Sequence, residues 1–226
     1  MIALIGNGKT GSQVLKLSED QDWQLFNSTN RPSFEKLKQC DAAIIFVPGN
    51  VLEQYIPILL ETAIPVICGT TGFDYPEGFD QQVKQRKQVW IHANNFSPAM
   101  SVVRNMIKIL NSSAQLLTDF EAKIIERHHI QKQDSPSGTA IRWKEWLGQE
   151  CSIEAHREGD VVGYHELSLE GPLEKITLAH ESKDRSLFAR GALLALQWVL
   201  EDRVKIGFSR FEALIDKELQ CKQANL

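Results

Sequence analysis

The chain begins with a short apolar segment, residues 2–5, that runs directly into the glycine pattern Gly6-x-Gly8-x-x-Gly11. Val14 and Leu15 then start a helical pattern, so the expected order is strand, glycine turn and helix. Glycines there permit a tight turn and a close approach of the backbone to a pyrophosphate, which the N–H groups of a helix N-terminus stabilise. The pattern predicts a nucleotide-binding turn, with an ordinary glycine-rich turn as the alternative. The candidate phosphate contacts are Gly6, Gly8, Lys9, Thr10 and Gly11.

Strand and helix patterns alternate as far as Asn95. A helical segment at 57–63 and a polar stretch at 80–87 separate apolar runs that have the length of strands. Such alternation favours a parallel, doubly wound sheet with right-handed crossovers. The further strands expected are Trp23–Phe26, Asp41–Val47, Ile64–Cys68 and Gln88–His92.

The pattern changes after Pro98, where a helix over Met100–Leu110 is followed by segments that alternate as strands do. A strongly apolar helix over Ser186–Leu200 is expected to pack back on the first sheet. We therefore predict an α/β protein with an N-terminal Rossmann-type doubly wound parallel sheet and an α+β second domain with a mixed sheet. The later strands expected are 119–125, 161–169 and 174–180, and the domains are 1–96 plus 187–226 (dinucleotide-binding, discontinuous) and 97–186.

Composition excludes several classes of protein. Of 226 residues, 42% are hydrophobic and 24% are charged, so neither disorder nor a fibrous repeat is expected. The net charge of -4 gives no general attraction to nucleic acid or to an anionic membrane. No apolar run approaches the ~18 residues of a membrane span, and the start lacks the basic region of a signal peptide, so we expect a cytoplasmic protein. The four cysteines lie far apart in the sequence, which disfavours a disulfide framework or a zinc site.

The segment after the second expected strand bears on the choice of cofactor. A site that prefers NAD usually has an Asp or Glu about 20 residues after the glycine pattern, where it binds the ribose hydroxyl. No carboxylate stands between Phe26 and Arg31 in this sequence. Hydroxyl and amide groups together with Arg31 suit a 2′-phosphate, so the sequence favours NADPH over NADH. The candidate contacts here are Asn27, Ser28 and Arg31.

Residues 126–140 form the most unusual stretch of the chain. His128 and His129 are adjacent, and neighbours on an extended chain point to opposite sides, so they make a poor chelating pair and metal binding is disfavoured. A histidine with Lys132 a few residues later could supply a proton and a fixed positive charge. That pair is what the reduction and protonation of a bound anion requires.

The residues that follow favour an anion as well. Ser135-Pro136 resembles an N-cap with proline at the first helical position. The backbone N–H groups of the first turn would then be unpaired and, with Lys132, would form a carboxylate or phosphate site. The alternative is a capped helix after a polar loop with two surface histidines. The amides in question are those of Ser137, Gly138 and Thr139.

These residues resemble the family of 4-hydroxy-tetrahydrodipicolinate reductases, formerly called dihydrodipicolinate reductases, of lysine and diaminopimelate biosynthesis. The family signature E-x-H-H-x-x-K-x-D-x-P-S-G-T-A is matched by residues 126–140, a long and specific pattern. The resemblance covers nearly the whole chain, and its further matches are the N-terminal glycine pattern and residues 69–73, 93–97, 157–165 and 185–192.

The resemblance implies an enzyme that reduces a cyclic dicarboxylate with NADPH or NADH, with loss of water, to give tetrahydrodipicolinate. It assigns acid/base work to His128 and proton donation to Lys132, both in a second domain that binds substrate and forms oligomers. It also implies a homotetramer, and the composition and the adjacent histidines predict no nucleic-acid or membrane partner and no metal. The implied substrate contacts are His129, Lys132, Gly138, Thr139 and Arg185, and the implied nicotinamide contacts are Gly69, Thr70, Thr71, Ala93, Asn94, Asn95 and Phe96.

The chain departs from the family pattern in its first domain. Residues 43–48 lack the acidic residue that the family commonly has before the phenylalanine, and also the Thr and Arg often found before the proline. Few residues separate the second and third expected strands, so a trimmed first domain is expected. In the signature itself, Ser135 replaces the usual alanine.

Two other functions stay open at this point. One is another two-domain NAD(P)-dependent oxidoreductase acting on a small carboxylate, such as an amino-acid or semialdehyde dehydrogenase. The other is a non-catalytic, nucleotide-sensing paralogue. Lys132 and the intact sequence 136–139 favour a working dicarboxylate site over the second, and no cysteine stands in a nucleophile context for a semialdehyde dehydrogenase. The remaining histidines are interpreted as structural, with His165 the best exception: His92, His156, His165 and His180.

Overall fold

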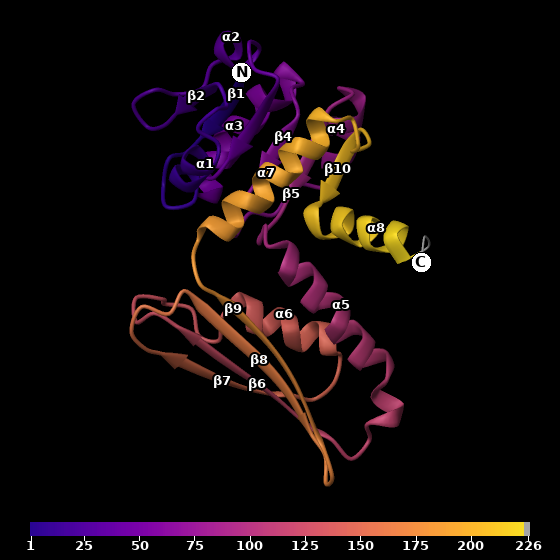
Figure 1. The fold of residues 1–226 in the computed structure, drawn as a ribbon. Helices are drawn as coiled ribbons and strands as arrows, with labels where there is room; N and C mark the ends of the chain where they lie inside the picture. The colour runs from indigo at the N-terminus through magenta and orange to yellow at the C-terminus, as the bar shows by residue number, and fades with distance from the viewer. Residues whose placement is uncertain (224–226) are drawn as a thin grey trace. The chain divides into compact units, whose positions relative to one another are not determined.

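The computed structural model describes residues 1–223, and the chain forms two compact units (Figure 1). The first unit contains residues 1–98 and the segment from Arg185 onward, and the second contains residues 99–184. The chain therefore leaves the first unit after five strands and returns to it for its last helices. Among the described residues, none of the helices combines the length and apolar character that crossing a membrane requires.

Six strands form the sheet of the first unit, and every neighbouring pair is parallel. Their order is β10-β5-β4-β3-β1-β2, so the direction of winding reverses between β1 and β3. At such a switch point the carboxyl ends of the strands border a crevice in which ligands bind. The predicted parallel sheet of Rossmann type is confirmed, with strands β1 (Ile2–Ile5), β2 (Trp23–Phe26), β3 (Ala42–Ile45), β4 (Val66–Cys68), β5 (Val89–His92) and β10 (Gly207–Arg210).

Helices cover both faces of this sheet because its strands are apolar on both sides. In β1, Ile2 and Leu4 pack in the cluster that contains α1, α7 and α8, whereas Ala3 and Ile5 pack with α2, α3 and α4. Burial of each large aliphatic side chain contributes about 1.5–3 kcal/mol. Helix α7 packs against the sheet, as predicted, and the helices are α1 (Gly11–Leu17), α2 (Phe34–Leu37), α3 (Gly49–Thr62), α4 (Phe79–Gln85), α7 (Ser186–Leu200) and α8 (Phe211–Gln223).

Two glycines close the turn after β1. Gly6 has a φ of 97°, in the left-handed region that residues with a Cβ avoid. A Cβ added at Gly11 would collide with the carbonyl oxygen of Gly6. Gly8 differs, because a Cβ there would meet no heavy atom of the described chain within 4 Å. Gly6 and Gly11 are therefore required for the shape of the turn. At Gly8 the space next to the backbone is free of other described atoms of the chain, so a ligand could approach there.

The second unit has a four-stranded mixed sheet in the order β7-β6-β8-β9. Strand β6 pairs parallel with β7 and antiparallel with β8, and β8 pairs antiparallel with β9. Helices α5 and α6 pack on one face, where Ile124 and Leu167 from the strands meet Ile107 and the fully buried Trp143. The elements are α5 (Pro98–Ser112), a 3₁₀ turn (Ala114–Leu116), β6 (Glu121–His128), α6 (Gly138–Leu147), β7 (Ser152–Arg157), β8 (Gly163–Glu170) and β9 (Lys175–Ser182).

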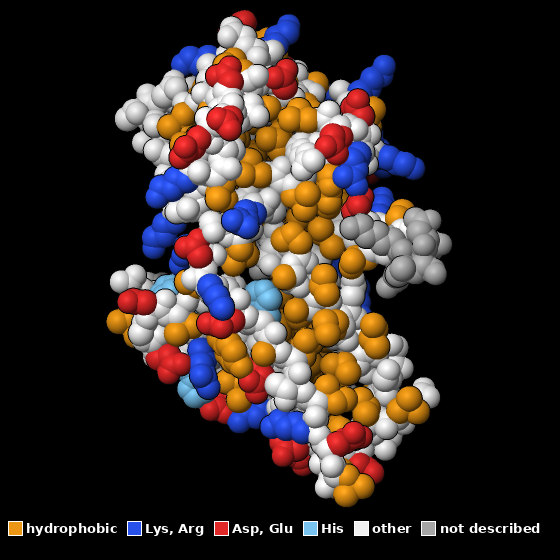
Figure 2. All heavy atoms as spheres, in the orientation of Figure 1, with side chains coloured by type: hydrophobic (Ala, Val, Ile, Leu, Met, Phe, Trp, Pro, Cys, Tyr) orange, Lys and Arg blue, Asp and Glu red, His pale blue; other side chains and the backbone are white. Residues whose placement is uncertain are grey.

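Helix α5 carries apolar side chains on its surface as well as in the core. Met106 and Ile109 are 46% and 64% exposed, and hydrophobic side chains gather over this helix in Figure 2. Elsewhere on the face drawn in Figure 2, acidic and basic side chains are interspersed, in agreement with the net charge of -4.

The start of α6 differs from the sequence-based expectation. Ser137, rather than Ser135, is the N-cap, because Ser137 has an extended backbone and its Oγ accepts a hydrogen bond from the N–H of Ala140 at 3.2 Å. Pro136 therefore lies before the helix and does not occupy its first position.

Among the described residues, the elements missed in the sequence are α2, the 3₁₀ turn, β7, β10 and α8. Strand β7 shows why, because its residues are exposed or only partly buried and lack the apolar alternation of a core strand. Helix α3 begins at Gly49, eight residues before the segment 57–63 in which part of a helix was predicted, and the other predicted elements have boundaries shifted by a few residues.

Candidate functional site

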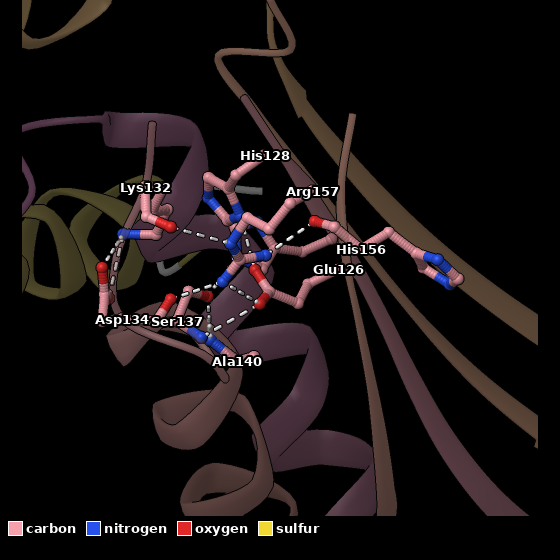
Figure 3. Close-up of polar contacts among 9 residues, drawn as sticks. Glu126, His128, Lys132, Asp134, Ser137, Ala140, His156 and Arg157 are labelled. Atoms are coloured by element: carbon pink, nitrogen blue, oxygen red, sulfur yellow. Dashed lines mark hydrogen bonds and ion pairs between the residues drawn. The ribbon is translucent and has the colours of Figure 1, made fainter. Parts of the chain in front are cut away.

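The carboxyl end of β6 carries the residues that the sequence singled out, and the sheet brings partners to them. Alternate strand residues share a face, so Glu126 and His128 point the same way. Antiparallel pairing with β8 places His165 opposite Glu126, and parallel pairing with β7 places Arg157 opposite His128. These side chains form a polar cluster that Ser137, at the start of α6, completes (Figure 3).

Glu126 is fully buried at the centre of this cluster. Its Oε1 accepts hydrogen bonds from the N–H of Ser137 at 3.1 Å and from Nη2 of Arg157 at 3.0 Å, and its Oε2 lies 2.5 Å from Nδ1 of His128. Burial alone raises the pKa of a carboxyl. Hydrogen bonds from Ser137 and Arg157 and the charge of His128 outweigh burial, and the pKa of Glu126 lies below its ordinary value. Glu126 is therefore a carboxylate.

The two buried histidines differ in their surroundings. Burial lowers the pKa of His128, Glu126 raises it, and the charges of Lys132 and Arg157 lower it, so that it lies below the ordinary value. Burial and the charge of His128 lower the pKa of His165 to about 3. His165 is therefore neutral, and its Nε2 lies 3.1 Å from Oγ of Ser137.

Lys132 follows in the loop after β6, and its ammonium group holds a carboxylate of the same loop. Its Nζ donates to Oδ1 and Oδ2 of Asp134 at 2.7 and 2.9 Å (Figure 3). The hydrogen bond and charge of Lys132 hold the pKa of Asp134 below its usual range, and the backbone of Gly138 adds a smaller contribution. Lys132, which the sequence predicted to bind an anion together with Gly138, thus pairs with a carboxylate of its own loop in this structure.

The prediction for the backbone amides of α6 needs a correction. The N–H of Ser137 is not open to a ligand, because it donates to Glu126. A Cβ added at Gly138 would meet no heavy atom of the described residues within 4 Å, so an anion has room to approach there. Thr139 is partly buried in the same first turn. His129 lies next to the cluster, and its N–H donates to the carbonyl of Val161 at 2.7 Å.

Three groups of the cluster lie close enough together to hold a metal ion. Glu126, His128 and His165 each offer one ligand atom, and these atoms lie within 4.8 Å of one another. The sequence argument considered only the adjacent His128 and His129, so it missed a grouping that the pairing of β6 with β8 creates. The guanidinium of Arg157 already pairs with Glu126, and its charge disfavours a second cation.

In the first unit, the residues proposed to bind the cofactor lie after the carboxyl ends of the strands. The loop after β2 is organised by Asn27, whose Oδ1 accepts hydrogen bonds from the N–H groups of Thr29 and Asn30, both at 2.9 Å. Ser28 and Arg31 are exposed in this loop. Lys36 donates to the Asn30 side chain at 2.8 Å, which adds a cation that the sequence analysis did not consider.

The loops after β4 and β5 also contain predicted contacts. The carbonyl oxygen of Thr70 lies 2.9 Å from Nε2 of the buried His92, which fixes the peptide between Thr70 and Thr71. Thr71 is exposed beside it. Phe96 is fully buried in the core of the first unit, and Ala93, Asn94 and Asn95 precede it.

Arg185 was predicted to bind substrate, and it lies at the N-cap of α7 in the first unit. Lys132 and His128 belong to the second unit. Arg185 and the polar cluster around Glu126 therefore belong to different units.

Comparison with known proteins agrees with these observations. A dihydrodipicolinate reductase from Paenisporosarcina sp. TG-14, solved with dipicolinate bound, shares the fold with a TM-score of 0.70 and 20% identity, over 92% of this chain and 96% of that one. Fold and site together define an NAD(P)H-dependent oxidoreductase with a Rossmann-type sheet and a separate mixed-sheet unit.

Sequence comparison narrows this class to one family. The family model described as "Dihydrodipicolinate reductase, C-terminus" matches residues 102–214. The 4-hydroxy-tetrahydrodipicolinate reductase of Christiangramia forsetii is 33% identical over 95% of this chain and 98% of its own length, and that of Alkaliphilus oremlandii is 29% identical over 86% and 90%. The chain belongs to the 4-hydroxy-tetrahydrodipicolinate reductase family, as its signature predicted.

Proposed function

We propose that this protein reduces 4-hydroxy-tetrahydrodipicolinate to tetrahydrodipicolinate with NADPH or NADH and loss of water, in lysine and diaminopimelate biosynthesis. One observation carries the proposal most directly: Nζ of Lys132 already holds a carboxylate, that of Asp134, in the loop that leads to Gly138. A carboxylate of the substrate would replace Asp134 there. The family signature and the relatives named above support the same activity.

The two units divide the work in this proposal. The first unit is the dinucleotide-binding domain, and the second binds the substrate and forms the oligomer. The turn after β1 fits a pyrophosphate, because Gly8 leaves its outer side open. The residues proposed to hold the dinucleotide are Gly6, Gly8, Lys9, Thr10, Gly11, Asn27, Ser28, Arg31, Gly69, Thr70, Thr71, Ala93, Asn94, Asn95 and Phe96.

The second unit supplies binding groups and a proton. The bound nicotinamide supplies a hydride. Lys132 fixes a substrate carboxylate and donates a proton to the ring, and His128 does acid/base work beside it. Holding the substrate in one orientation removes about 7–11 kcal/mol of barrier, which exceeds the contribution of acid catalysis alone. The proposed substrate contacts are His129, Lys132, Gly138, Thr139 and Arg185.

We propose that the reaction needs no metal. Glu126 is the anionic member of the group Glu126, His128 and His165 that could bind a metal ion. Its negative charge is already balanced by Arg157 and by the N–H of Ser137. We also propose a homotetramer in the cytoplasm. The exposed apolar side chains of α5 support an oligomeric surface on the second unit.

A coupled assay tests the activity. Freshly generated 4-hydroxy-tetrahydrodipicolinate is expected to cause rapid loss of NADPH absorbance, and the rate is expected to stay unchanged after treatment with EDTA. A folded protein that binds NADPH and shows no turnover would return the assignment to another oxidoreductase or a nucleotide-sensing paralogue. A rate that EDTA abolishes and Zn²⁺ restores would contradict the metal-free proposal.

The choice of cofactor has a separate test. Arg31 is exposed in the loop after β2, and Lys36 is anchored to that loop through Asn30, so both cations suit the 2′-phosphate of NADPH. Replacing Arg31 with alanine is expected to weaken NADPH binding about 10- to 100-fold, since a charge-assisted hydrogen bond contributes about 1.5–3 kcal/mol, and to leave NADH binding unchanged. Fluorescence titration with both cofactors measures the difference. An equal loss of affinity for NADPH and NADH would mean that Arg31 does not bind the 2′-phosphate.

A further inference from the structure

Glu126 has no assigned role in the proposed reaction, although it lies at the centre of the site. It is fully buried, and a buried carboxylate is costly unless charged or hydrogen-bonding partners surround it. Its partners are therefore the evidence for what it does. They are Arg157 on β7, His128 on β6 and the backbone N–H of Ser137, the N-cap residue of α6.

Through Arg157, Glu126 is connected to the loop that carries Lys132. Nη2 of Arg157 donates to Oε1 of Glu126 at 3.0 Å and also to the carbonyl of Asp134, and Nε donates to the carbonyl of Lys132 at 3.2 Å. Figure 3 shows this guanidinium among the labelled residues, with the neighbouring His156 pointing away from it. The planar guanidinium of Arg157 thus holds two backbone carbonyls of the loop in place. Glu126 in turn holds the guanidinium.

Through its other oxygen, Glu126 acts on His128. Oε2 lies 2.5 Å from Nδ1, so the carboxylate contacts this ring nitrogen and Nε2 is left for chemistry. Nε2 lies 3.2 Å from the position that a Cβ at Gly163 would take, so the glycine leaves space beside that nitrogen. The other charged or titratable groups around His128 are Lys132 in the loop, Arg157 on β7 and His165 on β8, whose ring centroid is 5.1 Å away.

Among these groups, Glu126 is the one whose charge favours protonated His128. Lys132 and Arg157 lower the pKa of His128, as burial does, and Glu126 raises it. Removing the negative charge would leave the imidazole among two cations in a buried site. The pKa of His128 would then fall further below its ordinary value.

We propose that Glu126 is the positioning residue of this site: one oxygen orients His128 through Nδ1, and the other holds Arg157, which in turn fixes the backbone of Lys132 and Asp134. The inference rests on the proposed function, because it assigns Glu126 to the groups that would perform that reaction. Glu126 itself does not touch the substrate in this account.

The test replaces Glu126 with glutamine, which keeps the shape and removes the charge. E126Q is expected to lower kcat about 10- to 100-fold, the loss typical when a partner that orients a metal-binding histidine is removed. The KM for the substrate and the Kd for NADPH are expected to change little. The pKa of His128, followed by NMR titration of its imidazole, is expected to move to lower pH.

Glu154 provides a matched control. It is an exposed glutamate on β7 that pairs with a histidine and a lysine, with Oε1 2.8 Å from Nε2 of His156 and Oε2 beside Lys123. E154Q therefore removes the same charge from a similar set of partners on the same sheet. It is expected to leave kcat and the His128 titration at their wild-type values.

The outcomes separate the positioning role from a merely structural one and from failure of the proposed function. A folded E126Q with wild-type kcat and an unshifted His128 titration would overturn the inference. If E126Q does not fold, Glu126→Asp keeps the charge and shortens the reach, and a wild-type kcat for that variant would overturn it instead. If the wild-type protein itself lacks turnover, the proposed function fails, and the NMR titration still decides whether Glu126 controls His128.

Discussion

Replacing Lys132 with alanine is expected to lower kcat by about 10²- to 10⁴-fold, the usual contribution of a positioned acid, while NADPH binds with unchanged Kd. Lys132 lies in the second unit, and its ammonium group is the cation that holds the carboxylate of Asp134. The variant would lose both that charge and the proposed proton donor. Stopped-flow or steady-state oxidation of NADPH measures kcat, and fluorescence titration measures cofactor binding.

Lys123→Ala is the control for this variant. Lys123 lies on β6 in the same unit, is about as exposed as its ion-pair partner Glu154 and stands outside the cluster. An exposed ion pair contributes only about 0–1 kcal/mol, so K123A is expected to fold and turn over normally. Equal loss of turnover and NADPH binding in K132A would indicate a folding defect, and normal turnover would remove Lys132 from the mechanism.

Replacing Gly11 with alanine is expected to have the largest effect on the first unit. The added Cβ would collide with the carbonyl oxygen of Gly6, and a backbone atom cannot move aside as the end of a side chain can. Overpacking typically costs ~1–3 kcal/mol, and for a chain of this size each kcal/mol lowers Tm by roughly 2–4 °C. Calorimetry of G11A is expected to show such a fall, together with loss of NADPH binding because the turn no longer closes.

Gly8→Ala is the matched variant in the same turn. A Cβ there meets no described heavy atom within 4 Å, so G8A is expected to keep the wild-type Tm. It is expected to weaken NADPH binding all the same, because the methyl group would occupy the side on which a pyrophosphate approaches. A G8A protein that binds NADPH as well as the wild type would show that the dinucleotide does not lie over this turn.

Local patterns in the sequence were enough to predict much of the fold. Each strand of the first sheet that was predicted is an apolar run next to a turn signal, and the glycine pattern identified the turn after β1. Strand β7 and helix α8 were not found, because the first is an edge strand with partly exposed residues and the second has a weaker apolar pattern. The position of the α6 N-cap was missed by two residues, since Ser135 and Ser137 are both plausible caps in sequence.

Part of the candidate site could likewise be predicted from short segments of the sequence. The sequence predicted that Lys132 and Gly138 would meet around an anion, because they lie in one short segment that leads into a helix. The spacing of Glu126 and His128 also implied that they share a face of the strand, a signal that was present and not used. Both facts depend only on residues close together in the chain.

The sequence by itself thus determined the family and the alternation of elements, since each rests on local patterns in the chain. Only the tertiary structure decided that Arg157 and His165 join Glu126 and His128, because the register of β7 and β8 against β6 brings together residues about 30 to 40 positions apart. That register follows from how the whole sheet packs against α5 and α6. A side chain's partner across a sheet is a property of this packing, which no short segment of sequence contains.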